Sequence, residues 1–130
     1  MKFGYTIVYV PDVDASLTFF ERAFDFARRF FHESGTYGEL DTGETTLSFA
    51  SHALGEMNFP DGYIAASISA RPLGMEVAFT TPNVAAAHAH AVAAGAVSLK
   101  EPEKKPWGQV MSYVRCPDGT LVELCSPIEN

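Results

Sequence analysis

The chain has 130 residues, of which 47% are hydrophobic, 12% aromatic and 19% charged, a composition typical of one folded globular domain with its own core. Its formal net charge of −7 and isoelectric point near 4.9 argue against nucleic acid or an anionic membrane surface as a partner, since both would repel it. No apolar stretch is long enough to cross a bilayer.

The first half of the chain opens with a β-rich run that stops at Pro11, after which the apolar pattern takes a helical period. Leu17, Phe20 and Phe24 fall on one face of a helix that starts at Val13, with Asp12 or Asp14 as its N-cap. A glycine between two later apolar runs, Gly43, suits a tight hairpin. The predicted elements are strand 3–10, the helix, strand 28–32, hairpin strands 37–40 and 45–50, and a loop over 54–62.

The second half repeats this order after an ambiguous stretch, residues 63–72. Pro82 and Asn83 open a helix, and Gly95 is the predicted C-cap. The predicted elements are strand 74–80, helix 84–94, short strand 97–99, a loop over 101–107, and hairpin strands 110–115 and 120–125.

Strand, helix, strand and hairpin therefore occur twice, which indicates an internal repeat. Aligning Asp12 with Asn83 superposes the first strands and helices, and aligning Gly43 with Gly119 superposes the hairpins. We predict an α+β fold: a single domain of two tandem βαβββ modules, about 3–52 and 73–127, with linker 53–72. Because each module leaves one sheet face bare, the strands should form a cup with one helix per module outside.

The two cysteines, Cys116 and Cys125, flank a predicted turn at a spacing that fits neither a zinc site nor a thioredoxin motif. Reduced structural thiols are expected. The N-terminal residues lack the pattern of a signal peptide, so the predicted location is cytoplasmic.

Three strings carry a resemblance to a known family: YVPDVDASL from Tyr9, AAGA from Ala93, and CPDGTLVEL from Cys116. With this layout, residues 3–127 resemble the glyoxalase/bleomycin-resistance/dioxygenase superfamily, also called the vicinal oxygen chelate superfamily. Pro-Asp-Gly followed four residues later by Glu is the most distinctive part, and Pro106-Trp107-Gly108 also looks typical.

The resemblance implies four strand positions that hold the metal in the enzymes of this superfamily. Here they fall on Tyr5, Glu76, Glu123 and Leu47, or on Thr46 or Ser48 in place of Leu47 if the hairpins differ by one residue. Glyoxalase I-like enzymes need nitrogen or carboxylate ligands at all four positions. Ring-cleaving dioxygenases and fosfomycin thiol transferases need two His and one Glu. Neither His is present, which argues against all three chemistries; no cofactor or metal is expected, and any divalent metal would use Glu76 and Glu123.

Glu76 and Glu123 each interrupt an apolar strand, where a solvated carboxylate is not expected. Facing one cup, the pair has three uses: binding a divalent ion, sharing a proton so that one acts as a general base, or pairing with a ligand ammonium group. The structural alternative is a strand carboxylate that caps backbone groups. Tyr5 is the third catalytic candidate, as a hydrogen-bond donor or acid, against the common half-buried strand tyrosine.

Apolar walls with few polar groups define most small-molecule sites. The predicted pocket residues are Trp107, Tyr113, Met111, Phe49, Leu47 and His52. His88 should pack against the sheet, and it cannot form a metal pair with His90, because residues two apart do not share a helix face.

Three functions remain open. The first is binding without chemistry: a small-molecule-binding protein that sequesters a drug-like or metabolite ligand. The second is a lyase or isomerase that uses Glu76 and Glu123 for proton transfer or a divalent metal. The third is a structural or regulatory dimer. The expected partners are a small-molecule ligand and a second copy in a homodimer, as in many superfamily members, with no nucleic acid and no membrane.

Overall fold

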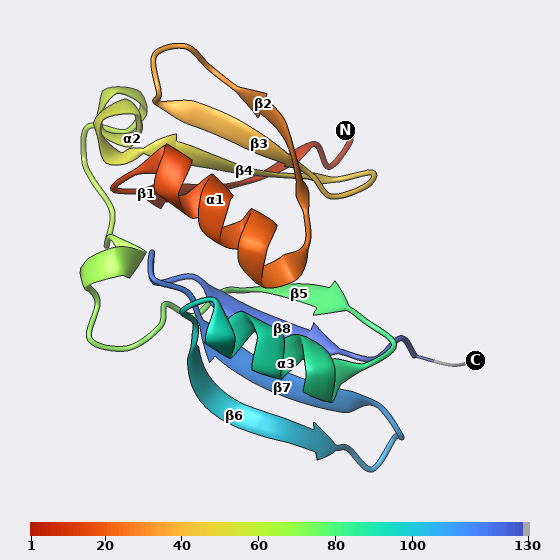
Figure 1. The fold of residues 1–130 in the computed structure, drawn as a ribbon. Helices are drawn as coiled ribbons and strands as arrows, with labels where there is room; N and C mark the ends of the chain where they lie inside the picture. The colour runs from red at the N-terminus through yellow and green to blue at the C-terminus, as the bar shows by residue number, and fades with distance from the viewer. Residues whose placement is uncertain (129–130) are drawn as a thin grey trace.

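The computed structural model describes residues 1–128 as two four-stranded mixed sheets and their helices (Figure 1). The first sheet has the order β1-β4-β3-β2 and the second β5-β8-β7-β6, with β1–β4 and β5–β8 parallel and the other pairs antiparallel. The elements are β1 Tyr5–Val10, α1 Val13–Phe24, β2 Ala27–Phe31, β3 Tyr37–Asp41, β4 Thr46–Ser51, α2 His52–Asn58, the 3-10 helix η1 Ala66–Ile68, β5 Glu76–Thr80, α3 Val84–Ala93, β6 Val97–Lys104, β7 Val110–Arg115 and β8 Leu121–Cys125.

Each module folds by placing one amphipathic helix on one face of its sheet. In the first module the Asp12 side chain accepts a hydrogen bond from the Ala15 amide and caps α1. In the apolar stripe of this helix Leu17 and Phe20 are fully buried and Phe24 is partly buried, and Phe20 contacts Phe49 of β4 at a ring-centroid distance of 4.9 Å. The predicted α+β architecture of two repeated modules is confirmed.

The second module is built in the same way around α3. Asn83 caps this helix through the Ala86 amide, and Gly95 follows its end with a φ of +122°, as expected at a helix terminus. His88 is buried as predicted, with Nδ1 2.9 Å from Ser112 Oγ and Nε2 2.8 Å from Ser98 Oγ. Its two ring nitrogens are therefore satisfied inside the module.

The two modules share one core because α1 and α3 pack side by side on the same side of the sheets (Figure 1). Phe79 of β5 contacts Phe24 and Phe26 at ring-centroid distances of 5.1 and 4.8 Å. A buried hydrogen bond of 2.8 Å from Ser16 to Asp118 adds a polar connection between the modules. The other face of each sheet carries no helix, and we call it the open face.

Two predicted local structures are wrong. Residues 54–62, predicted as loop, include most of α2, which starts because the Ser51 hydroxyl caps the Leu54 amide. The predicted loop over 101–107 is largely strand, because β6 continues through Pro102 to Lys104. Register shifts along β6 opposite β7 absorb the extra residues of the second module as irregular strand.

Strand pairing also corrects the alignment of the repeat. Glu123 pairs with Ala78 in the second module, and Ser48 pairs with Ile7 at the matching place in the first. The counterpart of Glu123 is therefore Ser48, the alternative position, and not Leu47. Leu47 points into the helix-covered core.

Within residues 1–128, no helix is long and apolar enough to cross a membrane. Both cysteines are free and buried. Burial raises the pKa of the Cys116 thiol, and burial together with the Glu123 carboxylate raises the pKa of Cys125 to about 11. Both side chains therefore remain thiols at neutral pH.

Candidate functional site

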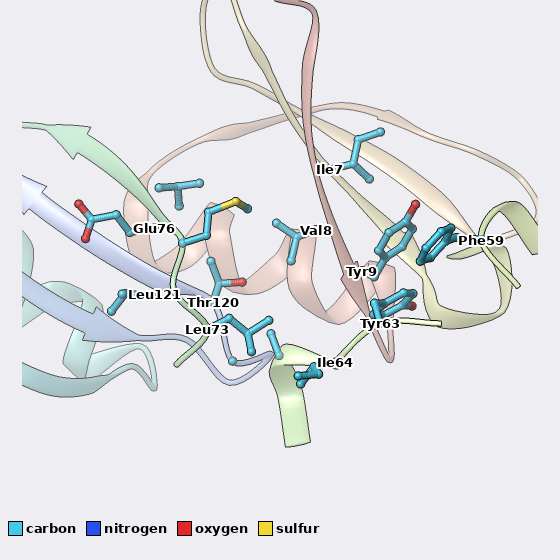
Figure 2. Close-up of a pocket in the computed structure, with 14 residues that line it drawn as sticks. Ile7, Val8, Tyr9, Phe59, Tyr63, Ile64, Leu73, Glu76, Thr120 and Leu121 are labelled. Atoms are coloured by element: carbon cyan, nitrogen blue, oxygen red, sulfur yellow. The ribbon is translucent and has the colours of Figure 1, made fainter. Parts of the chain in front are cut away.

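An apolar cavity of about 340 Å³ lies at the junction of the two modules (Figure 2). One wall comes from β1, a second from β5 and the start of β8, and a third from the segment between α2 and β5. The lining residues are Ile7, Val8, Tyr9, Phe59, Tyr63, Ile64, Ala66, Leu73, Met75, Glu76, Val77, Gly119, Thr120 and Leu121. This size and apolar character are typical of a site for a small organic molecule.

One end of the cavity is acidic. Glu76 on β5 lies at the end of the lining (Figure 2). Glu123 on β8 is buried outside the lining and is hydrogen-bonded to Glu76. Desolvation, then the hydrogen bond and the charge from Glu123, raise the pKa of Glu76. Tyr113 on β7 donates a 2.8 Å hydrogen bond to Glu123 Oε1, and burial with these carboxylates raises the pKa of Tyr113 to about 12. The phenol therefore stays a donor, and the carboxyl group of Glu76 holds a proton more tightly than that of an isolated glutamate.

No lysine or arginine neutralises this pair in the part of the chain that the structure describes. The open face of the first module differs, because Glu39 accepts a 2.7 Å hydrogen bond from Tyr37 and also has Arg29 Nε at 3.6 Å. The carboxylate on the open face of the first module therefore has a cationic partner, whereas the carboxyl pair on the open face of the second module has none. Charge without a partner is costly near a protein interior, and it favours a cationic group from outside the chain.

The opposite end of the cavity is aromatic. Tyr9 and Tyr63 stack with ring centroids 4.8 Å apart, and Phe59 lies beside them in Figure 2. The Tyr63 hydroxyl is hydrogen-bonded to Nδ1 of His52 at 2.7 Å. The site is therefore asymmetric, with flat apolar surface at one end and carboxylates at the other.

The structure brings together some of the residues predicted from sequence. Glu76, Glu123 and Tyr113 form one cluster, and Met111 lies on the same open face two residues from Tyr113. Tyr5 lies on the other module, where it pairs with Thr46 on β4. Tyr5 therefore does not join the acidic cluster within the chain.

The other predicted pocket residues lie elsewhere. Phe49 is fully buried in the core, which corrects its assignment to the pocket. Leu47 is also a core residue, although its edge contributes to a second, more polar hollow that Glu76 shares. Trp107 is exposed in the turn after β6, where Nε1 donates to Gln109. His52 is not a lining residue, and it contacts the cavity wall through its hydrogen bond to the Tyr63 hydroxyl.

Sequence reasoning missed the wall formed by residues 59–75. Most of this segment was predicted as loop or linker, and Met75 as part of strand 74–80, yet the segment supplies Tyr63, Ile64, Leu73 and Met75 to the cavity. The apolar content of this segment was the available signal. Apolar side chains in a solvated linker would be exposed to water, so their presence indicated that the segment packs against the sheets or a ligand.

The donor set does not fit the metal site of the superfamily. Within residues 1–128, no group of three or more His, Cys, Asp or Glu side chains is arranged so that it could hold a metal ion. The two carboxylates have as their repeat-related positions Tyr5 and Ser48, neither of which is a strong ligand for a divalent ion. We therefore derive no chemistry through a metal.

The fold and the strand positions define a known class of protein. The chain belongs to the glyoxalase/bleomycin resistance protein/dioxygenase superfamily, whose family model matches residues 2–124. No curated protein matches the sequence.

Solved structures share the fold at low sequence identity. The chain is similar to a glyoxalase-related enzyme from Fulvimarina pelagi (TM-score 0.80, 22% identity, covering 98% of this chain and 88% of that one). A superfamily enzyme from Burkholderia phytofirmans PsJN is similar at a TM-score of 0.79 and 20% identity, covering 97% and 98%. TioX from Micromonospora sp. ML1 is similar at a TM-score of 0.71 and 20% identity, covering 97% and 98%.

Proposed function

We propose that the protein binds a small molecule in the cavity between its modules, with an apolar or aromatic body against Tyr9 and Tyr63 and a cationic group at Glu76 and Glu123. One observation carries the proposal: an apolar cavity ends at Glu76, whose carboxyl group is hydrogen-bonded to buried Glu123, and the described chain places no lysine or arginine against this pair. A ligand cation would supply the missing charge, and the apolar wall would supply most of the buried area. The proposal needs no metal.

A charge-matched set of variants tests the role of the acidic end. Glu76→Gln and Glu123→Gln should each weaken binding of berberine, a fluorescent aromatic cation of fixed charge, by about tenfold, because each removes one attractive charge near the ligand. Fluorescence titration at pH 8 measures the dissociation constants. Glu33→Gln makes the same change in net charge at an exposed turn remote from the cavity, and should bind as the wild type does.

If all three variants bound berberine with equal affinity, Glu76 and Glu123 would have no role in binding the cation. Nile red, a neutral apolar dye, tests the cavity separately, because its binding depends on the walls alone. If the wild type bound neither dye, the binding function itself would be contradicted.

The raised pKa of Glu76 favours a second candidate, an enzyme of the lyase or isomerase type. A carboxylate whose pKa lies nearer to neutrality is a better general base, and Tyr113 remains a proton donor beside it. Deuterium from D₂O should then enter C–H bonds next to the carbonyl of added 2-oxo acids, and Glu76→Gln should abolish it. Absence of exchange across such a panel favours binding alone.

We also infer that a second copy of the chain covers the open faces. Tyr5 is 58% exposed on the first module, Ile7, Phe30 and Met75 are exposed too, and a second copy would remove these apolar side chains from water. The faces also differ in charge, with half-exposed Arg29 on the first module and the acidic pair on the second. A two-fold axis that places the first module of one copy against the second module of the other makes this contact twice.

Tyr5→Glu should weaken this dimer by at least about tenfold, because it buries a new charge and sets it opposite the acidic pair of the second copy. Sedimentation velocity over a dilution series measures the dissociation constant. Val92→Glu adds the same charge on the exposed side of α3 and should leave the constant unchanged. A wild-type chain that sediments as a monomer at high concentration would refute the dimer.

A further inference from the structure

The segment between α2 and β5, residues 59–75, forms one wall of the cavity, and we call it the strap. Its side chains in the cavity come from both of its ends and from its middle: Phe59, Tyr63, Ile64, Ala66, Leu73 and Met75. Figure 2 shows Leu73, Ile64, Tyr63 and Phe59 along the cavity, opposite Val8 of β1. The position of the strap therefore sets the width of the site.

The strap has little secondary structure to hold it. Its only regular element is the short helix η1, and the backbone hydrogen bonds of residues 60–75 recorded in the described chain stay inside the strap, from Gly62 to Phe59, Ile68 to Ala65 and Met75 to Leu73. No strand pairs with it. Its place against the sheets must come from side-chain contacts.

The central contact is a guanidinium group from the second module. Arg115, at the end of β7, points onto the open face and donates from Nη2 to the carbonyl oxygens of Ala66 and Ser69, both at 2.9 Å, and to Ser69 Oγ at 3.1 Å. Its Nε donates to the Gly119 carbonyl at 3.4 Å. A single side chain thus joins the β7–β8 turn to the middle of the strap, with the planar donor geometry that only arginine provides.

A second contact fixes the strap nearer α2. Tyr63 stacks on Tyr9 and is hydrogen-bonded to His52, and its ring lies over Gly55, where a Cβ would be 2.7 Å from the Tyr63 hydroxyl. Beyond Ser69, the side-chain hydrogen bond in the described chain is internal to the strap, from Ser69 Oγ to the Arg71 carbonyl at 2.7 Å, and none joins the part that carries Leu73 to the sheets. Arg115 is therefore the last fixed point before this part of the wall.

We propose that Arg115 is a positioning residue for ligand binding: it holds the strap in the conformation that forms the cavity wall, without touching the ligand. The inference rests on the proposed binding function. A wall held in place before binding loses less conformational entropy when a ligand arrives, so the contact raises affinity as well as stability.

The test compares Arg115→Ala with Arg28→Ala, a matched control. Arg28 also makes several hydrogen bonds, to Asp14, Thr18 and Glu21, but on the helix-covered side of the first module. Arg115→Ala should weaken both berberine and Nile red about tenfold, mainly through faster dissociation, and should speed amide hydrogen exchange in residues 59–75. Arg28→Ala should lower Tm without either change.

Arg115→Lys keeps the charge but not the fork of donors, so it should recover part of the affinity, and it also serves if the alanine variant folds poorly. Wild-type affinity in Arg115→Ala, or equal losses in both alanine variants, would overturn the proposal. If the wild type binds neither dye, the binding function fails first. Amide exchange still tests the role of Arg115 in that case. Unchanged exchange over residues 59–75 in the Arg115 variants would show that Arg115 does not hold the strap in place.

Discussion

Gly119→Ala is expected to destabilise the protein by about 2–4 kcal/mol and to open the cavity at the same time. Gly119 has a φ of +91°, where a Cβ is strained, and it closes the β7–β8 turn through a 2.8 Å hydrogen bond from its amide to the Cys116 carbonyl. A Cβ here would also collide with the backbone carbonyl of Ala66 in the strap. Backbone cannot move aside as a flexible side chain can, so either the turn or the strap must shift.

Gly43→Ala is the matched control for this substitution. Gly43 has a φ of +100° in the corresponding hairpin of the first module, and nothing lies within 4 Å of a Cβ built there. Alanine at this position should cost about 1 kcal/mol from backbone strain alone. Urea denaturation gives both free energies of unfolding, and dye titration gives the change in affinity.

The difference between the two variants isolates the contact between the turn and the strap. A larger stability loss in Gly119→Ala, together with weaker dye binding in that variant alone, is the expected result. Equal losses of stability and unchanged binding in both would show that the strap does not depend on this close approach.

Affinity for berberine is expected to fall by about tenfold between pH 8 and pH 4, because the carboxyl group of Glu76 becomes neutral and one charge is worth about a factor of ten. The pKa of Glu76 is raised by burial and by Glu123, so the decline begins at a higher pH than an ordinary glutamate would give. Berberine has a fixed charge, so its own protonation does not contribute. Near the raised pKa, binding should also release a proton, which calorimetry in buffers of different ionisation enthalpy measures.

The raised pKa of Glu76 also predicts that removing its charge stabilises the ligand-free protein, although the same change weakens binding. A folded-state pKa raised above the unfolded value stabilises the fold at low pH, and that contribution is lost as pH rises through the folded pKa. Glu76→Gln should therefore raise Tm at pH 8 and leave it nearly unchanged at pH 4. A substitution that stabilises the fold but weakens binding is typical of a functional site.

The double variant Glu76→Gln/Glu123→Gln is the control for the pH profile. It should bind berberine weakly and with little dependence on pH, while Nile red should bind the wild type and the glutamine variants equally at every pH. A pH profile that persisted in the double variant would place the titrating group elsewhere in the protein.

The sequence alone determined the order of the eight strands and of the two sheet-packed helices, the two-module repeat and the superfamily. Local signals carry this information: Asp12 and Asn83 cap the two helices, the apolar stripe with Leu17 and Phe20 faces the core, and Gly43 and Gly119 form the two hairpin turns. The sequence also singled out Glu76 and Glu123, because carboxylates that interrupt apolar strands are unusual, and Tyr113 as an aromatic residue of the predicted pocket wall.

The tertiary structure decided which residues share a site. The strand register differs by one residue from the predicted alignment, so Ser48, and not Leu47, is the first-module equivalent of Glu123. Because side chains alternate between the two faces of a strand, Leu47 then lies in the core. The wall formed by the strap could not be predicted from sequence either, because it too depends on tertiary contacts. The strap has no periodic pattern, and its position depends on Arg115, a residue distant in sequence that only the folded chain brings to it.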